Sequence, residues 1–322
     1  MPKEITHWLL AERTAARLEG TRMGDAARRY PKVLKLGAIF PDLPYYLTGT
    51  GGLARQSQIV GNEYHGAHGE DTYTLLRTML AGTMERASST PELLAFLAGT
   101  ACHLQADIAF HPLVYFMTGN YYDKDPSLRL RAIRNHRRLE GALDLYVCGG
   151  LAKARTFSAR TLWNGLECQP GKLFDAASRD PKHPELRSIL DQAAAKFLGA
   201  QGLFIRPALS WLVSLGTPVF SKETKALSAL FYTGSLAKHV SRLSGTLDYR
   251  NPVSGQSFSS TVAGLLDRAV DGSAALCRRL ESILESGDAD AFTEPGPSLN
   301  FGIVGADVSQ ARHFANPPFF LK

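Results

Sequence analysis

Residues 95–112, AFLAGTACHLQADIAFHP, decide the fold, because two histidines and an aspartate interrupt a long apolar run there. His103, Asp107 and His111 follow one another at intervals of four residues. At 3.6 residues per turn, each such step rotates by only about 40°, so one side of a helix carries all three side chains. The stretch therefore predicts a buried helix with one polar stripe.

A second helix is expected from Ser127 to about Cys148, where Gly149-Gly150 ends it. It carries His136, Glu140 and Asp144 at the same spacing. Two neighbouring antiparallel helices would present facing stripes of imidazole and carboxylate.

Buried imidazoles and carboxylates are costly unless they are paired or bind a metal. A single pair at this spacing usually does no more than stabilise a helix surface. Two triplets on consecutive helices, with further histidines upstream, favour a metal site instead. Imidazole and carboxylate without thiolate are ligands that suit zinc.

The rest of the chain also has helical periodicity, and alternating strand-like runs are scarce, so the sequence predicts an all-α fold, a multi-helix bundle with additional C-terminal helices. The segment 37–61 is rich in Gly and Pro and is predicted as a loop. Helices are expected over residues 3–19, 70–87, 91–110, 151–166, 185–200, 205–215, 221–244 and 257–286, with Pro112 limiting the helix that begins at Pro91.

The histidines divide the chain into two regions. Six of the 9 lie in the first 136 residues of the 322. We expect a catalytic region over 1–150 and a helical region of unknown role over 151–322, although one continuous core is an open alternative.

The composition excludes several classes of protein. With 44% hydrophobic and 20% charged residues, the chain is neither disordered nor collagen-like. The net charge of +6 permits an anionic partner without requiring one. The 4 cysteines are scattered and are expected to be free thiols. No signal peptide and no apolar run of about 20 residues is apparent, so a cytoplasmic protein without a transmembrane segment is expected.

Residues 95–112 resemble the signature of the zinc-dependent phospholipase C family, part of a superfamily of phospholipases and single-strand nucleases. Four further blocks resemble this family in the same order along the chain: Thr6-His7, Gly37–Asp42, the segment with His65 and His68, and His136-x₃-Glu140. The resemblance covers residues 1 to about 150.

The resemblance implies up to three zinc ions in one cleft. Asp42, an upstream histidine and His103 would hold the first ion with Asp107, which bridges to a third ion held by His7. The remaining ion would use His111, His136 and Glu140.

Two positions stay open. His68 is the preferred upstream ligand, because His68-Gly-Glu-Asp71 resembles the family's His-x-x-Asp, and His65 is the alternative. In secreted members of the family, the free amine and carbonyl of the N-terminal residue, five positions before the first ligand histidine, bind the third zinc. By this resemblance, a chain that begins at Pro2, five residues before His7, would offer its amine and carbonyl to that ion.

The implied activity is that of a zinc-dependent hydrolase of phosphoric diesters, which uses a metal-activated water. Asp42 is the candidate general base. Asp71 and Asp144 are candidates for orienting His68 or His136 through the second ring nitrogen. The expected substrate is a phospholipid headgroup. The alternatives are a nuclease-like phosphodiesterase acting on nucleic acid, or a non-catalytic helical module braced by metal.

Overall fold

The computed structural model describes residues 3–84, 90–216 and 220–321, and its centre is the 28-residue helix α6, Pro91–Thr118. Most α6 side chains are buried on every side of the helix. Its neighbours are α1 (Glu4–Arg17), α2 (Arg22–Arg29), α3 (Pro31–Gly37) and α15 (Val262–Ser286). The polar stripe predicted for this helix therefore lies inside the protein.

The described residues contain one helix long and apolar enough to cross a membrane, and it is α6. The protein itself buries 89% of the most apolar part of this helix. Its length and hydropathy are therefore explained by its place in the core, where helices from both ends of the chain cover it.

The prediction that Pro112 ends this helix was wrong, since α6 continues to Thr118. Proline removes one backbone donor but leaves the following turns able to form. Beyond it, Leu113, Val114 and Met117 are all buried. Burial of these side chains offsets the lost hydrogen bond, and the helix continues past the proline.

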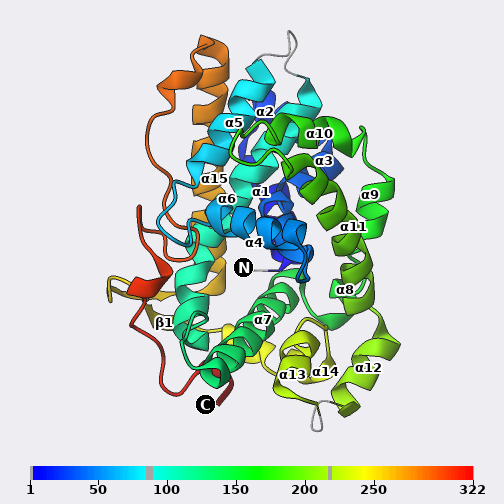
Figure 1. Ribbon diagram of the computed structural model, residues 1–322, viewed down its shortest axis with the longest axis vertical. Helices are drawn as coiled ribbons and strands as arrows, with labels where there is room; N and C mark the ends of the chain where they lie inside the picture. The colour runs from blue at the N-terminus through cyan, green and yellow to red at the C-terminus, as the bar shows by residue number, and fades with distance from the viewer. Residues whose placement is uncertain (1–2, 85–89, 217–219, 322) are drawn as a thin grey trace.

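The remaining helices surround α6, as Figure 1 shows. Helices α7, α12, α13 and α14 lie together at one end of the molecule. The bounds of these helices are α4 (Gly52–Tyr64), α5 (Tyr73–Met84), α7 (Pro126–Cys148), α8 (Leu151–Ala154), α9 (Ala159–Asn164), α10 (Pro170–Ala177), α11 (Leu186–Phe204), α12 (Pro207–Gly216), α13 (Lys222–Ser228) and α14 (Gly234–Ala237). Short 3₁₀ turns occupy η1 (Phe40–Tyr46), η2 (Val240–Leu243), η3 (Ala289–Ala291), η4 (Val308–Gln310) and η5 (Phe319–Leu321).

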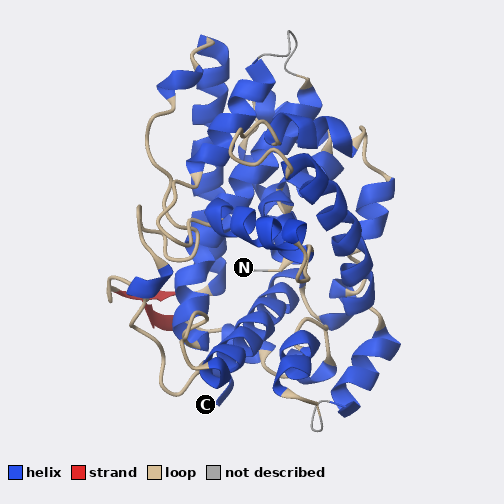
Figure 2. Cartoon of the chain, in the orientation of Figure 1, coloured by secondary structure: helices blue, strands red, loops and turns tan. Residues whose placement is uncertain are grey.

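The all-α prediction is confirmed, and the differences are local (Figure 2). Residues 52–61, which belong to the segment predicted as loop, form most of α4, whose glycines lie near its ends. Residues 257–260, predicted as helix, form strand β2 (Ser257–Ser260), which pairs antiparallel with β1 (Leu247–Arg250). The expected helix over 221–244 is divided into short helices separated by turns.

One hydrophobic core joins the two regions that the histidine distribution separated. Side chains of α6, of α11 and of α15 belong to the same buried cluster. A second, smaller cluster packs Tyr115 of α6 against Phe301 near the C-terminus. Residues beyond 150 thus build the interior that surrounds α6.

Candidate metal centre

The polar stripe of α6 forms the floor of the candidate site. His103, Asp107 and His111 are almost completely buried, with exposed fractions of 0%, 0% and 1%. Their burial among apolar neighbours means that each polar atom must find a partner inside the protein.

The first group of candidate ligands joins this stripe to two loops. Asp42 lies in η1, and His65 follows the last residue of α4. The Nε2 atom of His65 lies 3.2 Å from Oδ1 of Asp42 and 3.5 Å from Oδ2 of Asp107. The Nε2 atom of His103 lies 3.7 Å and 3.3 Å from the same two oxygens. Two imidazoles and two carboxylates therefore converge on one point.

The second carboxylate oxygen of Asp107 faces another set of imidazoles. Its Oδ1 lies 3.4 Å from Nε2 of His7 on α1 and 3.8 Å from Nε2 of His111. The rings of His7 and His103 are stacked at 4.3 Å between centroids. Asp107 thus stands between two groups, with one oxygen toward each.

The third group lies where α6 meets α7. His111, His136 and Glu140 each offer a ligand atom within 4.8 Å of the others. The Nε2 atom of His136 is 2.8 Å from Oε1 of Glu140. Burial lowers the pKa of both His111 and His136 well below the usual value, so both imidazoles are neutral at pH 7 and have a lone pair to give.

Backbone carbonyls set the orientation of three of these histidines. The Nδ1 atom of His65 donates to the Gly61 carbonyl at 2.7 Å, and that of His103 to the Ala38 carbonyl at 2.9 Å. The Nδ1 atom of His111 donates to the Leu299 carbonyl at 2.9 Å. A carbonyl only accepts, so Nδ1 carries a proton in each of the three rings, and Nε2 is the ring atom directed into the site.

A close contact between two helices positions the Ala38 carbonyl. A Cβ atom added to Gly99 of α6 would lie 2.1 Å from the Leu34 carbonyl oxygen, and one on Gly37 would lie 2.2 Å from that of Phe96. Only glycine permits this approach at either position. It brings the end of α3 against α6 one turn before His103.

These groups have the properties of an incomplete coordination shell. Among the described residues, buried atoms with no hydrogen-bond partner include Nε2 of His7, His103 and His111 and both carboxylate oxygens of Asp107. Ligand atoms about 2.0–2.2 Å from a tetrahedral zinc ion lie about 3.3–3.6 Å apart. The separations of 3.2–3.8 Å around Asp42 and Asp107 are close to that range. The residues present therefore fit zinc.

The comparison with protein families agrees with this geometry. The family model described as zinc dependent phospholipase C matches residues 6–189. The chain belongs to the zinc-dependent phospholipase C family. Among curated proteins and among solved structures, no match was found.

The preference for His68 as a family ligand is reversed by the structure. His68 is exposed, and its Nδ1 lies 3.3 Å from Oδ2 of Asp307, away from the three groups. The chain turns at Gly66, where φ is 59°, and carries His68 outward. His65 is buried and occupies the position that the resemblance assigns to the upstream ligand.

Asp71 does not orient a ligand histidine either. Its carboxylate pairs with Arg77 and accepts hydrogen bonds from the backbone of Tyr73 at 2.9 Å and of Gly296 at 2.6 Å. It ties the start of α5 to the C-terminal segment.

Asp144 acts on α1 instead of on His136. Lys3, the N-cap of α1, makes no side-chain cap. The Asp144 carboxylate accepts from the amides of Ile5 at 3.2 Å and Thr6 at 2.9 Å, and from the Thr6 hydroxyl at 2.6 Å. Both amides belong to the first turn of α1, where backbone donors lack acceptors one turn back; the Thr6 amide otherwise reaches only the Lys3 carbonyl at 3.2 Å. Asp144 of α7 therefore caps the helix that carries His7. Pro2 lies outside the described residues.

Tyrosine rings surround the imidazoles of the third group. The ring centroids of Tyr115 and Tyr121 lie 4.8 Å and 5.1 Å from that of His136. Tyr45 lies 5.0 Å from His65. The site is thus bordered by apolar faces with hydroxyl groups.

The C-terminal segment at residues 298–301 is the part of the site that the sequence did not indicate. It lies beyond the family match, yet Leu299 holds His111, and the Leu299 amide donates to the His65 carbonyl at 2.9 Å. Every residue type has a backbone carbonyl, so no sequence pattern could have identified this contact.

Proposed function

We propose that the protein is a zinc-dependent hydrolase of phosphoric diesters that acts on phospholipid headgroups as a phospholipase C. The observation that carries the proposal is the position of Asp107, with each carboxylate oxygen directed at a different set of imidazoles. Such a carboxylate is suited to bridge two metal ions, and sites with two neighbouring metal ions are typical of phosphodiester hydrolysis.

Zinc bound by these residues would lower the pKa of a water molecule and neutralise charge on the phosphate oxygens. The chain's own residues set where this happens. Nδ1–H donation to Gly61, Ala38 and Leu299 keeps the Nε2 atoms directed inward.

Asp42 is the proposed general base. Its side chain is 11% exposed, whereas the side chain of Asp107 is 0% exposed, so Asp42 lies at the rim of the centre. Its Oδ1 faces His65 and His103, which supports a role in taking a proton from a water that enters there.

The tyrosine rings favour one second candidate, a nuclease-like phosphodiesterase. Tyr121 and Tyr45 border the site, and nucleobases stack on such rings. The same rings also suit the apolar part of a phospholipid, so substrate assays have to decide.

The test combines zinc analysis with hydrolysis of phosphatidylcholine, phosphatidylinositol, single-stranded DNA and a bis-aryl phosphodiester. We expect bound zinc and preferential phospholipid turnover. The variants His103→Ala and Asp42→Asn should lower the rate about 100-fold or more, because each removes a ligand or the base. His313→Ala is the matched control, since His313 lies outside the ligand groups.

Each other outcome has a distinct meaning. Turnover of DNA alone would support the nuclease. Bound zinc without turnover of any substrate would support a non-catalytic module braced by metal. Turnover unchanged in both site variants would refute the assigned site.

A further inference from the structure

Helix α12, Pro207–Gly216, has large apolar side chains on its exposed side. Trp211, Leu212 and Leu215 are 62%, 54% and 60% exposed. Positions i, i+1 and i+4 lie on the same side of a helix, so these three side chains form one continuous surface. We call it the α12 apolar face.

The other side of α12 packs on the protein. Ser210 is only 2% exposed, and Val213 and Ser214 line a pocket of about 340 Å³. The helix is therefore held in place by its inner side. Among the described residues, nothing covers the α12 apolar face, although exposed apolar surface of this kind generally marks an interaction site.

The charge along this part of the sequence is mainly positive, and Asp191 and Glu223 bound the stretch that has no carboxylate. From residue 192 to residue 222 the sequence contains no Asp or Glu, whereas Lys196, Arg206 and Lys222 all lie there and are exposed. Arg206 stands immediately before the first residue of α12.

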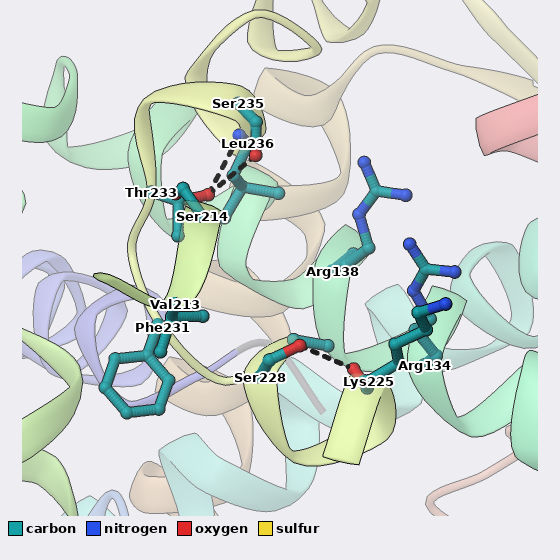
Figure 3. A pocket seen from close by; sticks show the side chains of 11 residues that line it. Arg134, Arg138, Val213, Ser214, Lys225, Ser228, Phe231, Thr233, Ser235 and Leu236 are labelled. Atoms are coloured by element: carbon teal, nitrogen blue, oxygen red, sulfur yellow. Dashed lines mark hydrogen bonds between the residues drawn. The ribbon is translucent and has the colours of Figure 1, made fainter. Parts of the chain in front are cut away.

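The pocket behind α12 adds further positive charge. Figure 3 shows Arg134 and Arg138 extending from α7 in the same direction. Lys225 also lines this pocket, and no carboxylate is among its lining residues. Burial and the neighbouring Arg134 lower the pKa of Arg138 to about 10, which still leaves it charged at pH 7. Arg134, Arg138 and Lys225 thus lie on the inner side of α12, in the pocket that Val213 and Ser214 also line.

We propose that α12 docks on the surface of an anionic phospholipid bilayer, with Trp211, Leu212 and Leu215 inserted among the acyl chains and the surrounding Lys and Arg side chains facing lipid phosphates. Helices that lie in a membrane interface combine Trp and Leu on one face with basic residues beside them. Tryptophan in particular favours the boundary between apolar and wet regions.

The charges also argue against a second copy of this chain as the occupant. A symmetric contact through the α12 apolar face would bring the same mainly positive region of two copies together. Like charges brought together in this way oppose association. An anionic bilayer offers the complementary charge.

This surface is separate from the metal centre. Arg134 and Arg138 precede and follow His136 by two residues, which places them on the opposite side of α7 from His136 and Glu140. The proposal rests on the proposed function only in that a phospholipid hydrolase must meet its substrate in a bilayer. Binding and hydrolysis are therefore measured apart.

The binding test is co-sedimentation of the full chain with vesicles. One set contains equimolar phosphatidylcholine and phosphatidylglycerol, and the other contains phosphatidylcholine alone. We expect stronger binding to the anionic set, weakened by salt. The double variant Leu212→Ser/Leu215→Ser should reduce the partition coefficient about tenfold or more. Arg206→Glu should reduce it for the anionic vesicles only.

Matched controls remove similar groups elsewhere. Ile59→Ser/Val304→Ser deletes two apolar side chains that are 47% and 55% exposed, and Arg13→Glu reverses an exposed charge on α1. Both controls should bind as the unsubstituted chain does. A blue shift of tryptophan emission on anionic vesicles, lost in Trp211→Ser, should locate the inserted side chain.

Three results would overturn the proposal: no vesicle binding by the unsubstituted chain, equal binding by the α12 double variant, or a dimer that this variant abolishes, which would make a second copy the occupant. Hydrolysis of a monomeric short-chain phosphodiester by the double variant should remain unchanged. If no form hydrolyses any substrate yet the α12 dependence of binding holds, the proposed function fails and the docking surface stands.

Discussion

His111 of α6 and Leu299 of the C-terminal segment are joined by a hydrogen bond of 2.9 Å between Nδ1 and the carbonyl oxygen, across 188 residues of sequence. The family match ends at residue 189, so a ligand inside the match depends on a segment outside it. The same segment is tied to α6 a second time, where the Tyr115 hydroxyl donates to Oδ1 of Asn300 at 3.1 Å.

Asn300→Ala should loosen this segment and weaken zinc binding by His111, His136 and Glu140. Partners that orient a ligand are generally worth about 10–100-fold in metal affinity, and an indirect partner should lie at the lower end, about tenfold. Competition with a chromophoric zinc chelator measures the change. Val304→Ala, at an exposed position three residues after this segment, is the control. Equal zinc affinity in both variants would contradict the role given to Asn300.

His65→Ala should lose about one zinc equivalent, while His68→Ala should lose none. The reason is position, since His65 faces Asp42 and Asp107 whereas His68 is exposed beside Asp307. Elemental analysis of the purified proteins gives the count. Loss of zinc from His68→Ala alone would restore the assignment that the sequence favoured.

Asp144→Ala should lower the free energy of unfolding by about 3 kcal/mol, because it leaves buried donors of α1 and the Tyr232 hydroxyl without their acceptor. Urea denaturation measures this loss. Asp25→Ala is the control, since Asp25 is 75% exposed in a surface pair and should change stability by less than about 1 kcal/mol. A small effect at both positions would show that Asp144 does not hold α1.

The zinc-free protein should become less stable as the pH falls below about 6.5. The pKa of His111 and of His136 is lowered by burial in the folded state, so the unfolded chain takes up protons first. Stability from the neutral imidazoles is complete above the unfolded pKa and decreases below it. Denaturation after chelation, on both sides of that pH, tests the sign. His111→Gln/His136→Gln should flatten the dependence.

A chain that begins at Pro2 should hold one more zinc ion than a chain that retains Met1. His7, His103 and Asp107 lie together, and the family resemblance leaves only His7 and Asp107 of these for the third ion, so the free amine and carbonyl of Pro2 would supply two more ligands. Zinc analysis of the two forms, separated by mass, provides the comparison. Equal counts would remove Pro2 from the site.

The polar stripe of α6 was predictable because it depends only on the spacing of residues within one helix. His103, Asp107 and His111 reveal their common side through spacing alone, and so do His136 and Glu140 of α7. The partners of these stripes were harder to identify. The choice between His65 and His68 depends on the turn at Gly66, and a one-residue change in that turn alters which ring faces inward.

Other features depended on tertiary packing, which local patterns do not contain. The spacing of Asp71 from His68 matched that of the family, yet in the structure the Asp71 carboxylate forms an ion pair with Arg77. Pro112 indicated a helix end, yet buried side chains beyond it extended α6. The glycines of residues 52–64 suggested a loop, but they fall at the ends of α4, where they do little to break it.

The burial of α6 also bears on how the chain is made. The helix that packs most extensively against α6 is α15. It begins at Val262, roughly 140 residues after α6 ends at Thr118. At about 5–20 residues per second, a ribosome needs roughly 10–30 s to synthesise that interval. Throughout this time α6, which is apolar enough to cross a bilayer, lacks the packing that α15 provides in the folded protein. We therefore expect chains truncated before Val262 to expose the α15-facing side of α6 and to aggregate more readily than the full chain.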